Sequence, residues 1–257
     1  MLQFDATVTK ILDDAYQGAD VAARRVEYIR LLQPRPGEHV LDIGSGPGLL
    51  ALDLARCVTE QGRVVGVEPS RQMREVAERR CADRNQVTFI DGEANALPVA
   101  DASFDAAVST QVFEYLPDVP TALEEVHRVL KPGGRVLIAD VHWDSLIWRS
   151  LDRPRMARMM EVWDRHLADR TLPERLAEML AAAGFRVERQ EPLVLFTPRL
   201  RGDSMAGALV HLVATYAVSS GQMSPAEAGA WAEEQWQLDR EGRFFFSLLQ
   251  FVFLARR

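Results

Sequence analysis

Cysteine is scarce in this sequence, and its scarcity excludes two kinds of site. The 257 residues include two cysteines, Cys57 and Cys81, and neither belongs to a Cys-x-x-Cys pair. This spacing predicts no disulfide framework and no cysteine-based metal or redox centre. We expect both thiols to be reduced packing residues within helices, as is typical of a cytoplasmic protein.

Long apolar runs and an excess of positive charge are also lacking. The most apolar segment, residues 244–254, is too short to cross a bilayer and is interrupted by Ser247 and Gln250. The first residues contain early acids and no long apolar stretch, which argues against a secretory signal. The 30 Lys and Arg residues and 37 Asp and Glu residues are interspersed, with a net charge of −7. No basic tract therefore suggests a nucleic-acid partner.

Apolar runs alternate with helical patterns through the first two thirds of the chain. We expect strands at 39–43, 63–68, 87–91, 104–110 and 135–140. We expect helices from Pro47 to about Val58, at 70–82 with Ser70 as its cap, and at 119–130. The strand-like runs are nearly all apolar, which is typical of a parallel sheet buried on both faces. Their order predicts right-handed βαβ units in a doubly wound α/β sheet.

The composition changes after Asp140. The segments expected beyond it are a Met- and Trp-rich helical stretch at 143–170, a helix ending at Gly184, a strand at 185–190, two helices within 203–241 and a last strand at 242–257. The second of the two helices opens with a capping box from Ser224 to Glu227. No repeat or low-complexity linker divides the chain, so we predict a single domain over residues 1–257.

The stretch VLDIGSGPGLL combines a strand, a glycine turn and the start of a helix. Gly44, Gly46 and Gly48 stand at alternate positions, where a nucleotide-like ligand is commonly held. Nicotinamide enzymes place G-x-G-x-x-G here, and Asp42 suits a cationic group better than a pyrophosphate. Glu68, at the end of the next strand, fits an acceptor for ribose hydroxyls. Together they indicate a nucleoside joined to a cation, and S-adenosylmethionine is such a molecule. The alternative is that the glycines only permit close packing and that Glu68 is solvated.

Five ordered segments carry a family resemblance: VLDIGSGPG, VVGVEPSRQM, DGEANALPVADASFDAAVS, VFEYLPD and LKPGGRVLIAD. With them the chain resembles class I S-adenosylmethionine-dependent methyltransferases, a group that includes quinone-biosynthesis C-methyltransferases and many small-molecule enzymes. The resemblance covers about residues 38–190 and, more loosely, the last strand. It implies a Rossmann-like, mostly parallel seven-stranded sheet with an antiparallel last strand. It also implies helical lid insertions, at 1–30 and at 203–241.

The resemblance implies the cofactor contacts. Asp42 and the glycine turn would hold the methionine portion and the ribose of S-adenosylmethionine. Glu68 would bind the ribose diol, and Pro69 and Met73 would line the adenine. Tyr16, in the N-terminal lid, would cover the methionine portion, where an aromatic ring attracts a sulfonium. An ordinary packing role is the alternative for Tyr16.

The adenine and the amino group of the methionine portion would be held from two later turns. Glu93 would accept a hydrogen bond from the adenine amino group, and the Ala94 N–H would meet a ring nitrogen. Relatives often have aspartate where Glu93 stands, which makes Asp91 a rival for that contact. Thr110 and Gln111 would offer backbone contacts to the methionine amino group.

Substrate in such a fold lies beyond the carboxyl ends of the strands. Tyr115 follows the fourth strand, and Asp140, His142 and Trp143 follow the fifth. We expect His142 and Tyr115 to be catalytic, since histidine is the side chain that titrates nearest to neutral pH. The alternative for His142 is a structural hydrogen bond, because spacing pairs it with no acid.

Several Met and Trp side chains stand at helical spacing after the fifth strand: Trp148, Met156, Met159, Met160 and Trp163. We expect these side chains either to line an apolar pocket or to form plain core. We expect Asp140, Trp143 and Trp148 to contact substrate. His211 and Tyr216, within 203–241, are weaker pocket candidates.

The sequence therefore predicts methyl transfer from S-adenosylmethionine, by in-line displacement, to an O, N, C or S atom of a small apolar or aromatic molecule. A catalytically silent scaffold or subunit that binds the cofactor is the alternative, and a nicotinamide oxidoreductase is disfavoured by the turn and Asp42. The acidic balance disfavours nucleic-acid methylation, and two cysteines disfavour arsenic methylation. We expect a small-molecule substrate, no metal, no nucleic acid and no membrane, and the sequence leaves a homodimer open.

Overall fold

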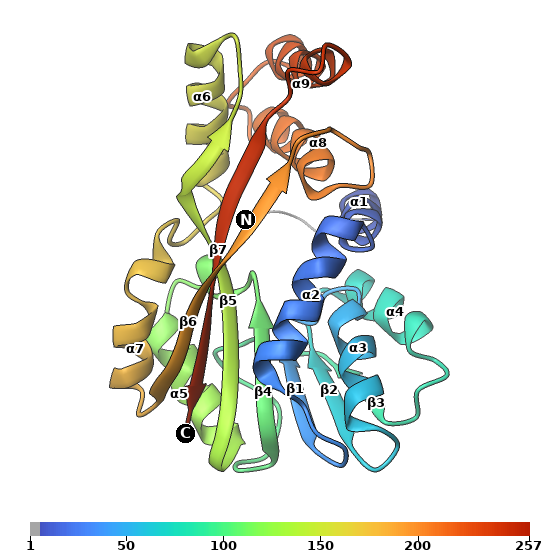
Figure 1. The fold of residues 1–257 in the computed structure, drawn as a ribbon, viewed down its shortest axis with the longest axis vertical. Coiled ribbons are helices and arrows are strands. Elements are labelled where there is room, and N and C mark those ends of the chain that lie inside the picture. Colours follow the sequence, from blue (N-terminus) through green and yellow to red (C-terminus); the bar gives the residue numbers. More distant parts are fainter. Residues whose placement is uncertain (1–5) are drawn as a thin grey trace.

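A seven-stranded sheet organises residues 6–257, the part of the chain that this computed structural model describes (Figure 1). Its strands are β1 (His39–Ile43), β2 (Arg63–Val67), β3 (Val87–Ile90), β4 (Phe104–Thr110), β5 (Leu130–Trp148), β6 (Arg186–Thr197) and β7 (Phe246–Arg256). Their order across the sheet is β3-β2-β1-β4-β5-β7-β6. The first five are parallel, and β7 is antiparallel to both β5 and β6. The doubly wound, mostly parallel sheet with an antiparallel last strand is confirmed.

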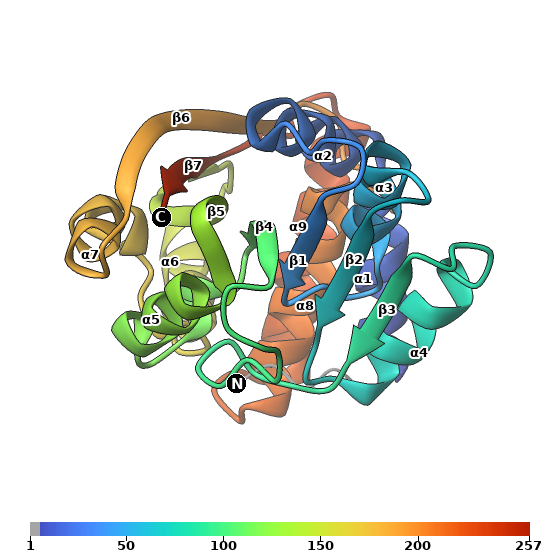
Figure 2. The same ribbon diagram turned by 90° about the horizontal axis from the view of Figure 1, so that it is seen from below.

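Helices cover both faces of the parallel part (Figure 2). The helices are α1 (Ala6–Tyr16), α2 (Ala19–Leu32), α3 (Leu49–Val58), α4 (Arg71–Arg80), α5 (Val119–Val129), α6 (Arg153–Asp164), α7 (Leu176–Ala182), α8 (Met205–Ser219) and α9 (Pro225–Arg240), with short 3-10 turns η1 (Phe113–Tyr115) and η2 (Leu172–Glu174). Apolar side chains of α2 and α3 pack on one face, and those of α5 and α7 pack on the other. Burial on both faces explains why the strands are almost uniformly apolar.

Beyond the parallel part, β5, β6 and β7 continue upward and meet α6, α8 and α9 (Figure 1). The helix expected over 143–170 is wrong in its first part, because β5 continues as a strand to Trp148. There Trp148 pairs with Phe246 of β7. The helix α6 starts only at Arg153, where the Asp152 side chain accepts a hydrogen bond from the Arg155 N–H. β6 also runs well past the strand expected at 185–190.

Local signals near the helix ends are mostly confirmed. The Ser70 side chain caps α4, and Ser224 and Glu227 form the expected capping box at the start of α9. The helix expected from Pro47 begins two residues later, because Gly48 takes a left-handed conformation just before α3. The two helices within 203–241 are α8 and α9. Their role as a lid, and that of α1 and α2, stays a prediction.

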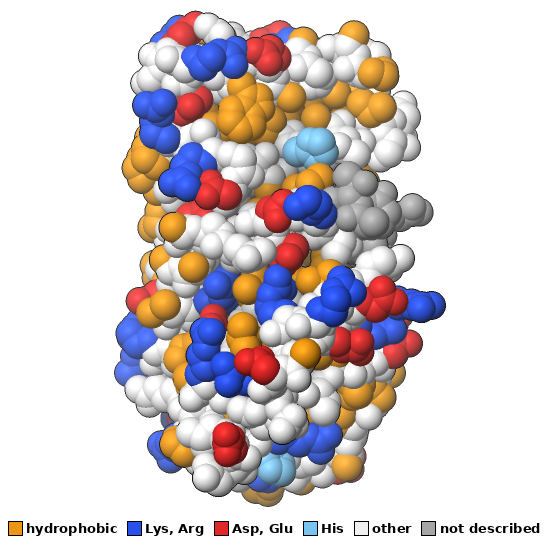
Figure 3. Space-filling model, turned by 90° about the vertical axis from the view of Figure 1, so that its right-hand side faces the viewer, with side chains coloured by type: hydrophobic (Ala, Val, Ile, Leu, Met, Phe, Trp, Pro, Cys, Tyr) orange, Lys and Arg blue, Asp and Glu red, His pale blue; other side chains and the backbone are white. Residues whose placement is uncertain are grey.

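Surface and burial agree with a balanced composition. Figure 3 shows one face, on which Lys and Arg side chains lie interspersed with Asp and Glu side chains.

Cys57 lies in α3 and Cys81 just past the end of α4, and both are free thiols. Burial raises the pKa of each thiol. Across residues 6–257, no helix combines the length and apolarity needed to span a membrane. The same residues form no cluster of three or more His, Cys, Asp or Glu side chains suited to a metal ion.

Candidate active site

The glycine turn between β1 and α3 is tied to the end of β2. The Gly44 N–H and the Ser45 N–H both donate to the Val67 carbonyl, at 2.8 and 3.1 Å. A Cβ at Gly44 would overlap the Val112 side chain, and one at Gly48 would approach the Ala77 Cβ to 2.8 Å. These two glycines therefore allow close packing, as the packing alternative supposed.

Gly46 differs from its two neighbours in the turn. All three glycines have a positive φ, but a Cβ built at Gly46 would meet no atom within 4 Å among the residues that the structure describes. Packing therefore does not explain Gly46. It leaves the backbone open at the point where the turn faces the carboxyl end of the sheet.

Two buried carboxyl groups lie beside this turn. The Glu68 Oε2 accepts the Gly46 N–H at 3.0 Å, and Oε1 accepts the Ser70 N–H at 2.9 Å. Glu68 is 7% exposed, so the alternative that it is solvated is wrong. Burial raises its pKa. Burial, with the nearby Glu68 charge, raises the pKa of Asp42 to about 7. The Asp42 Oδ2 has no hydrogen-bond partner within the described chain.

A buried cation, Arg24 of α2, lies in the same region and was missed from the sequence. It is 5% exposed, and its Nε and Nη2 atoms bond to nothing in the range 6–257. Its charge acts on Tyr16 and Tyr28, where it opposes the rise in pKa that burial causes. Val21, Arg24 and Tyr28 follow helical spacing on the buried face of α2. That pattern is the sequence signal that could have found Arg24.

These three groups fit S-adenosylmethionine. An unpaired buried carboxylate and an unpaired buried guanidinium are each costly, unless a ligand of opposite charge pairs with them. S-adenosylmethionine carries a cationic sulfonium and ammonium, a carboxylate and ribose hydroxyls. Asp42, Arg24 and the buried Glu68 therefore complement it group by group.

Other predicted cofactor residues lie around the same edge. Tyr16 is partly buried, and burial raises its pKa to about 12, with Glu114 and Glu68 charges adding to the effect. Among the predicted adenine contacts, Met73 and Ala94 are buried and Glu93 is exposed. Pro69, also predicted there, directly precedes the Ser70 cap of α4.

Two predicted contacts have other partners. Asp91, the rival of Glu93, is paired with Arg74 at 2.6 Å. Gln111 has a left-handed φ of +55°, and its N–H donates to the Ala139 carbonyl at 2.8 Å. An ammonium group only donates hydrogen bonds. The backbone contacts predicted from Thr110 and Gln111 would therefore come from their carbonyl oxygens.

A second pair of buried carboxyl groups stands between β4 and β5. Asp140 and Glu114 are fully buried; the first accepts the Val112 N–H at 3.0 Å and the second accepts the Val141 N–H at 2.8 Å. Burial raises both pKa values, and the Asp140 charge raises that of Glu114 further. Asp140 was expected to contact substrate, and here one of its oxygens orders the turn after β4. Glu114 was missed.

The predicted catalytic side chains behave differently from each other. Burial and the Glu114 charge raise the pKa of Tyr115 well above its ordinary value, so its phenol stays protonated. His142 has an acid partner after all, because its Nε2 lies 2.7 Å from Glu174 Oε1. The partner comes from η2, 32 residues along the chain, beyond the reach of spacing arguments.

Aromatic rings fill the space next to Tyr115. His166 lies 5.5 Å from Tyr115, 3.9 Å from Trp163 and 5.5 Å from Tyr216, measured between ring centroids. Burial lowers the pKa of His166 to about 4, and its Nδ1 bonds to the Trp163 carbonyl. His166 was missed from the sequence. Trp143 contacts Trp163 and His166, whereas His142 contacts Glu174 and Phe251.

The remaining pocket candidates are spread out. Trp148 lies at the end of β5 against Trp231 and Phe246, and His211 is exposed. Met156, Met159 and Trp163 are buried in one apolar cluster with Trp143 and Trp148, and Met160 packs against it. The structure therefore does not gather all predicted substrate residues at one point.

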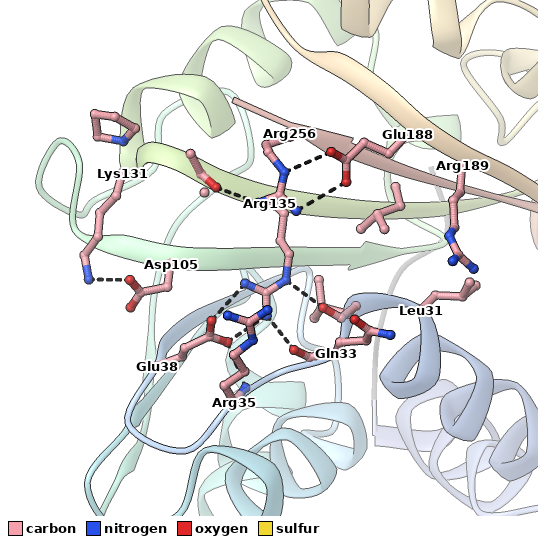
Figure 4. Close-up of a pocket in the computed structure, with 15 residues that line it drawn as sticks. Leu31, Gln33, Arg35, Glu38, Asp105, Lys131, Arg135, Glu188, Arg189 and Arg256 are labelled. Atoms are coloured by element: carbon pink, nitrogen blue, oxygen red, sulfur yellow. Dashed lines mark hydrogen bonds and ion pairs between the residues drawn. The ribbon is translucent and has the colours of Figure 1, made fainter.

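A cavity of about 340 Å³ lies at the other end of the sheet (Figure 4). Its walls carry paired charges: Arg135 bonds to Glu38 at 2.7 Å, Lys131 to Asp105 at 2.7 Å and Arg256 to Glu188 at 2.9 Å. These pairs join the segment before β1 to β5, β4 to β5, and β6 to β7. They give the cavity a structural explanation, so we do not place the active site there.

Comparison with known proteins identifies the family. A model of the family described as "Methyltransferase domain" matches residues 41–138. A demethylmenaquinone methyltransferase from Symbiobacterium thermophilum is 30% identical over 194 residues, which cover 66% of this chain and 77% of that protein. An uncharacterized 37.1 kDa transposon protein from Streptomyces fradiae is 33% identical over 245 residues, covering 91% and 68%.

Solved structures add the fold. That of a putative methyltransferase from Bacillus halodurans matches with a TM-score of 0.63 at 19% identity, and the match covers 91% of this chain and 98% of the other. The family resemblance expected from the five segments is confirmed. The chain belongs to the S-adenosylmethionine-dependent methyltransferase family.

Proposed function

We propose that the protein methylates a small, uncharged, apolar or aromatic molecule, with the cofactor held by Asp42, Glu68 and Arg24. Two observations carry the cofactor assignment: the buried, unpaired Asp42 carboxyl beside the glycine turn, and the buried, unpaired Arg24 guanidinium near Tyr16. Names of relatives support the acceptor class, since they include a demethylmenaquinone methyltransferase and fungal O-methyltransferases. Aromatic rings around Tyr115 support the same class.

When bound, S-adenosylmethionine supplies an electrophilic methyl group on its sulfonium sulfur. The residues of the chain bind and orient the two reactants. Arg24 pairs with the carboxylate of the methionine portion, while Asp42 and the carbonyls of Thr110 and Gln111 face its cationic groups. Glu68 accepts hydrogen bonds from the ribose.

The remaining cofactor contacts follow the predicted ones. Pro69 and Met73 line the adenine, the Glu93 side chain accepts from its amino group and the Ala94 N–H donates to the ring. Tyr16 covers the methionine portion. Its protonated phenol and ring exclude water from the reacting centre, where exclusion of water strengthens electrostatic contacts.

On the acceptor side, His142 is the proton acceptor when the reacting atom carries a proton. Glu174 accepts the Nε2 proton, which leaves Nδ1 free, and Nδ1 is buried without a hydrogen-bond partner among the described residues. A carboxylate that fixes the imidazole in this way is a common arrangement for a general base. Tyr115 is a hydrogen-bond donor, since its phenol stays protonated. Trp143 and Tyr115 both contact His166, and the Asp140 charge acts on Tyr115.

The proposal extends to the organisation of the chain. We propose a single domain over residues 1–257, in which the helices within 1–30 and 203–241 cover the site. The interspersed surface charge supports a small-molecule rather than a nucleic-acid partner. Protonated, unpaired Cys57 and Cys81 support a cytoplasmic location, and the homodimer stays a prediction.

Transfer of radiolabelled methyl groups tests the acceptor class. The purified protein is incubated with labelled S-adenosylmethionine and with phenols, quinols, amines and thiols in separate reactions. We expect labelled product from phenols or quinols. Cofactor binding without labelling of any acceptor would favour the silent scaffold instead. Labelling confined to charged amines would contradict the proposed acceptor class.

A further inference from the structure

A row of side chains crosses the upper part of the sheet, away from the cofactor residues. Trp148, Phe246 and Thr197 are register partners in β5, β7 and β6, so they lie side by side on one face. Helix α9 presents Trp231 and Gln235, which are one helical turn apart. The ring centroid of Trp148 lies 5.2 Å from that of Trp231 and 4.9 Å from that of Phe246. We call these five residues the upper cluster.

The polar atoms of the upper cluster have no partners. Within residues 6–257, nothing bonds to Nε1 of Trp148, Nε1 of Trp231, Oγ1 of Thr197 or either amide atom of Gln235. Trp231 and Gln235 are 0% exposed, and the others are buried as well. More than about 90% of buried polar groups in proteins are paired, so unpaired groups from four side chains at one place require an explanation.

Another buried glutamine shows what full pairing looks like. Gln250 is 1% exposed, its Oε1 accepts from the Tyr28 hydroxyl and its Nε2 donates to the Ala139 carbonyl at 3.1 Å. Gln235 satisfies neither amide atom within the described residues. An unmade hydrogen bond of this kind destabilises the fold, a cost that function commonly explains when stability does not.

The chemistry of the upper cluster defines its ligand. Two indole N–H groups can only donate, and the amide and the hydroxyl can both donate and accept. All five side chains are uncharged, and three are aromatic. The complementary ligand is therefore an uncharged, flat, largely apolar group that carries oxygen acceptors.

The upper cluster is continuous with the proposed active site. Trp148, Trp231 and Phe246 belong to one buried apolar cluster with Trp143, and Tyr16 packs against that cluster. The apolar packing is therefore continuous from Trp143 to α9.

We propose that the upper cluster is a subsite of the methyl acceptor, in which Gln235 and the two indoles bind the oxygens of a quinone- or phenol-like group. This inference rests on the proposed function in one respect, that the ligand is the methyl acceptor. The polar atoms are covered in this structure, so the ligand enters by parting α9 from the sheet. Gln235 is the residue that determines specificity there.

Quenching of tryptophan fluorescence by menadione, an uncharged quinone, tests the subsite. We expect saturable quenching of the full chain, because Trp148 and Trp231 adjoin the bound ring. In Gln235→Met the menadione Kd should rise at least tenfold, while the Kd for S-adenosylmethionine by calorimetry stays within twofold. The Tm without ligand should rise, because a thioether needs no hydrogen bond. Gln237→Met, on the exposed side of α9, should change none of these values.

Trp231→Phe is the second variant, because it keeps an aromatic ring and removes only the N–H donor. We expect it to raise the menadione Kd at least threefold. It provides the test if Gln235→Met does not fold. An unchanged menadione Kd in the folded variants, or the absence of saturable quenching by the wild type, would overturn the subsite.

The outcome separates the subsite from the proposed function. Quenching that depends on Gln235, in a protein that methylates no acceptor, would leave the subsite and remove the proposed function. Methyl transfer to a quinol with the same KM in wild type and Gln235→Met would support the proposed function and remove the subsite.

Discussion

Replacement of Arg24 by methionine separates a cofactor-binding arginine from a structural one. The guanidinium is 5% exposed, and two of its nitrogens bond to nothing in the part of the chain that the structure describes. Methionine fills similar space without a charge. If Arg24 pairs with the carboxylate of the cofactor, Arg24→Met should weaken S-adenosylmethionine binding and stabilise the ligand-free protein, because an unpaired buried charge is removed.

The size of the effect follows from the contact that is lost. A hydrogen bond to a charged group contributes about 1.5–3 kcal/mol. Since 1.4 kcal/mol corresponds to a tenfold change, the Kd should rise about 10- to 140-fold. Arg30→Met is the matched control, because Arg30 lies on the same helix, half exposed, with Glu27 and Glu191 as partners. It should leave the Kd unchanged.

Calorimetry with two ligands makes the test specific to the carboxylate. Decarboxylated S-adenosylmethionine lacks the group that Arg24 is proposed to bind. Wild type should therefore bind it more weakly than S-adenosylmethionine, whereas Arg24→Met should bind the two ligands alike. An equal loss of affinity for both ligands in Arg24→Met would refute the pairing and leave Arg24 as a residue that orders α2.

Four further predictions concern the carboxylates and the histidine. Because Asp42 has a pKa of about 7 here against 3.8 ordinarily, its ionisation destabilises the ligand-free fold as pH rises from about 4 to about 7. Asp42→Asn should therefore raise the Tm relative to wild type at pH 8 and not at pH 4. Equal Tm differences at both pH values would contradict this. Affinity for S-adenosylmethionine should increase with pH through about 7 in wild type, because the ionised carboxylate pairs with the cation, and calorimetry of Asp42→Asn should show a flatter pH profile. Glu68→Ala should raise the cofactor Kd at least tenfold by calorimetry, and wild-type affinity would show that Glu68 only orders the turn at Gly46. His142→Ala and Glu174→Gln should both lower kcat for a phenol acceptor with the cofactor Kd unchanged, and normal kcat in both would leave the pair a packing contact.

The sheet could be predicted from the sequence because its strands carry local information. Each parallel strand is a short apolar run bounded by a turn, and helix caps such as Ser70 and Ser224 mark where the helices start. The extension of β5 could not be predicted in this way. The apolar residues within 143–148 are Trp143, Leu146, Ile147 and Trp148, and their spacing fits a helix as well as a strand. The pairing of Trp148 with Phe246, about a hundred residues later, decides between the two.

The site residues also differ in whether local sequence could predict them. Asp42, Glu68 and the glycine turn lie within 27 residues of each other, so their spacing could be interpreted from the sequence. Arg24 could have been found from its buried position on α2, where an arginine is conspicuous. Glu174, His166 and Gln235 could not, because each reaches its place through contacts between distant segments. Spacing arguments are limited to what one βαβ unit brings together.

The central claim is that the glycine turn and its buried charges hold S-adenosylmethionine. Isothermal titration of the purified wild-type chain with S-adenosylmethionine, and separately with S-adenosylhomocysteine, tests it most directly. The account predicts one binding site per chain for each ligand, with the two ligands competing. Absence of binding heat for both ligands, in a protein that circular dichroism shows to be folded, would contradict it.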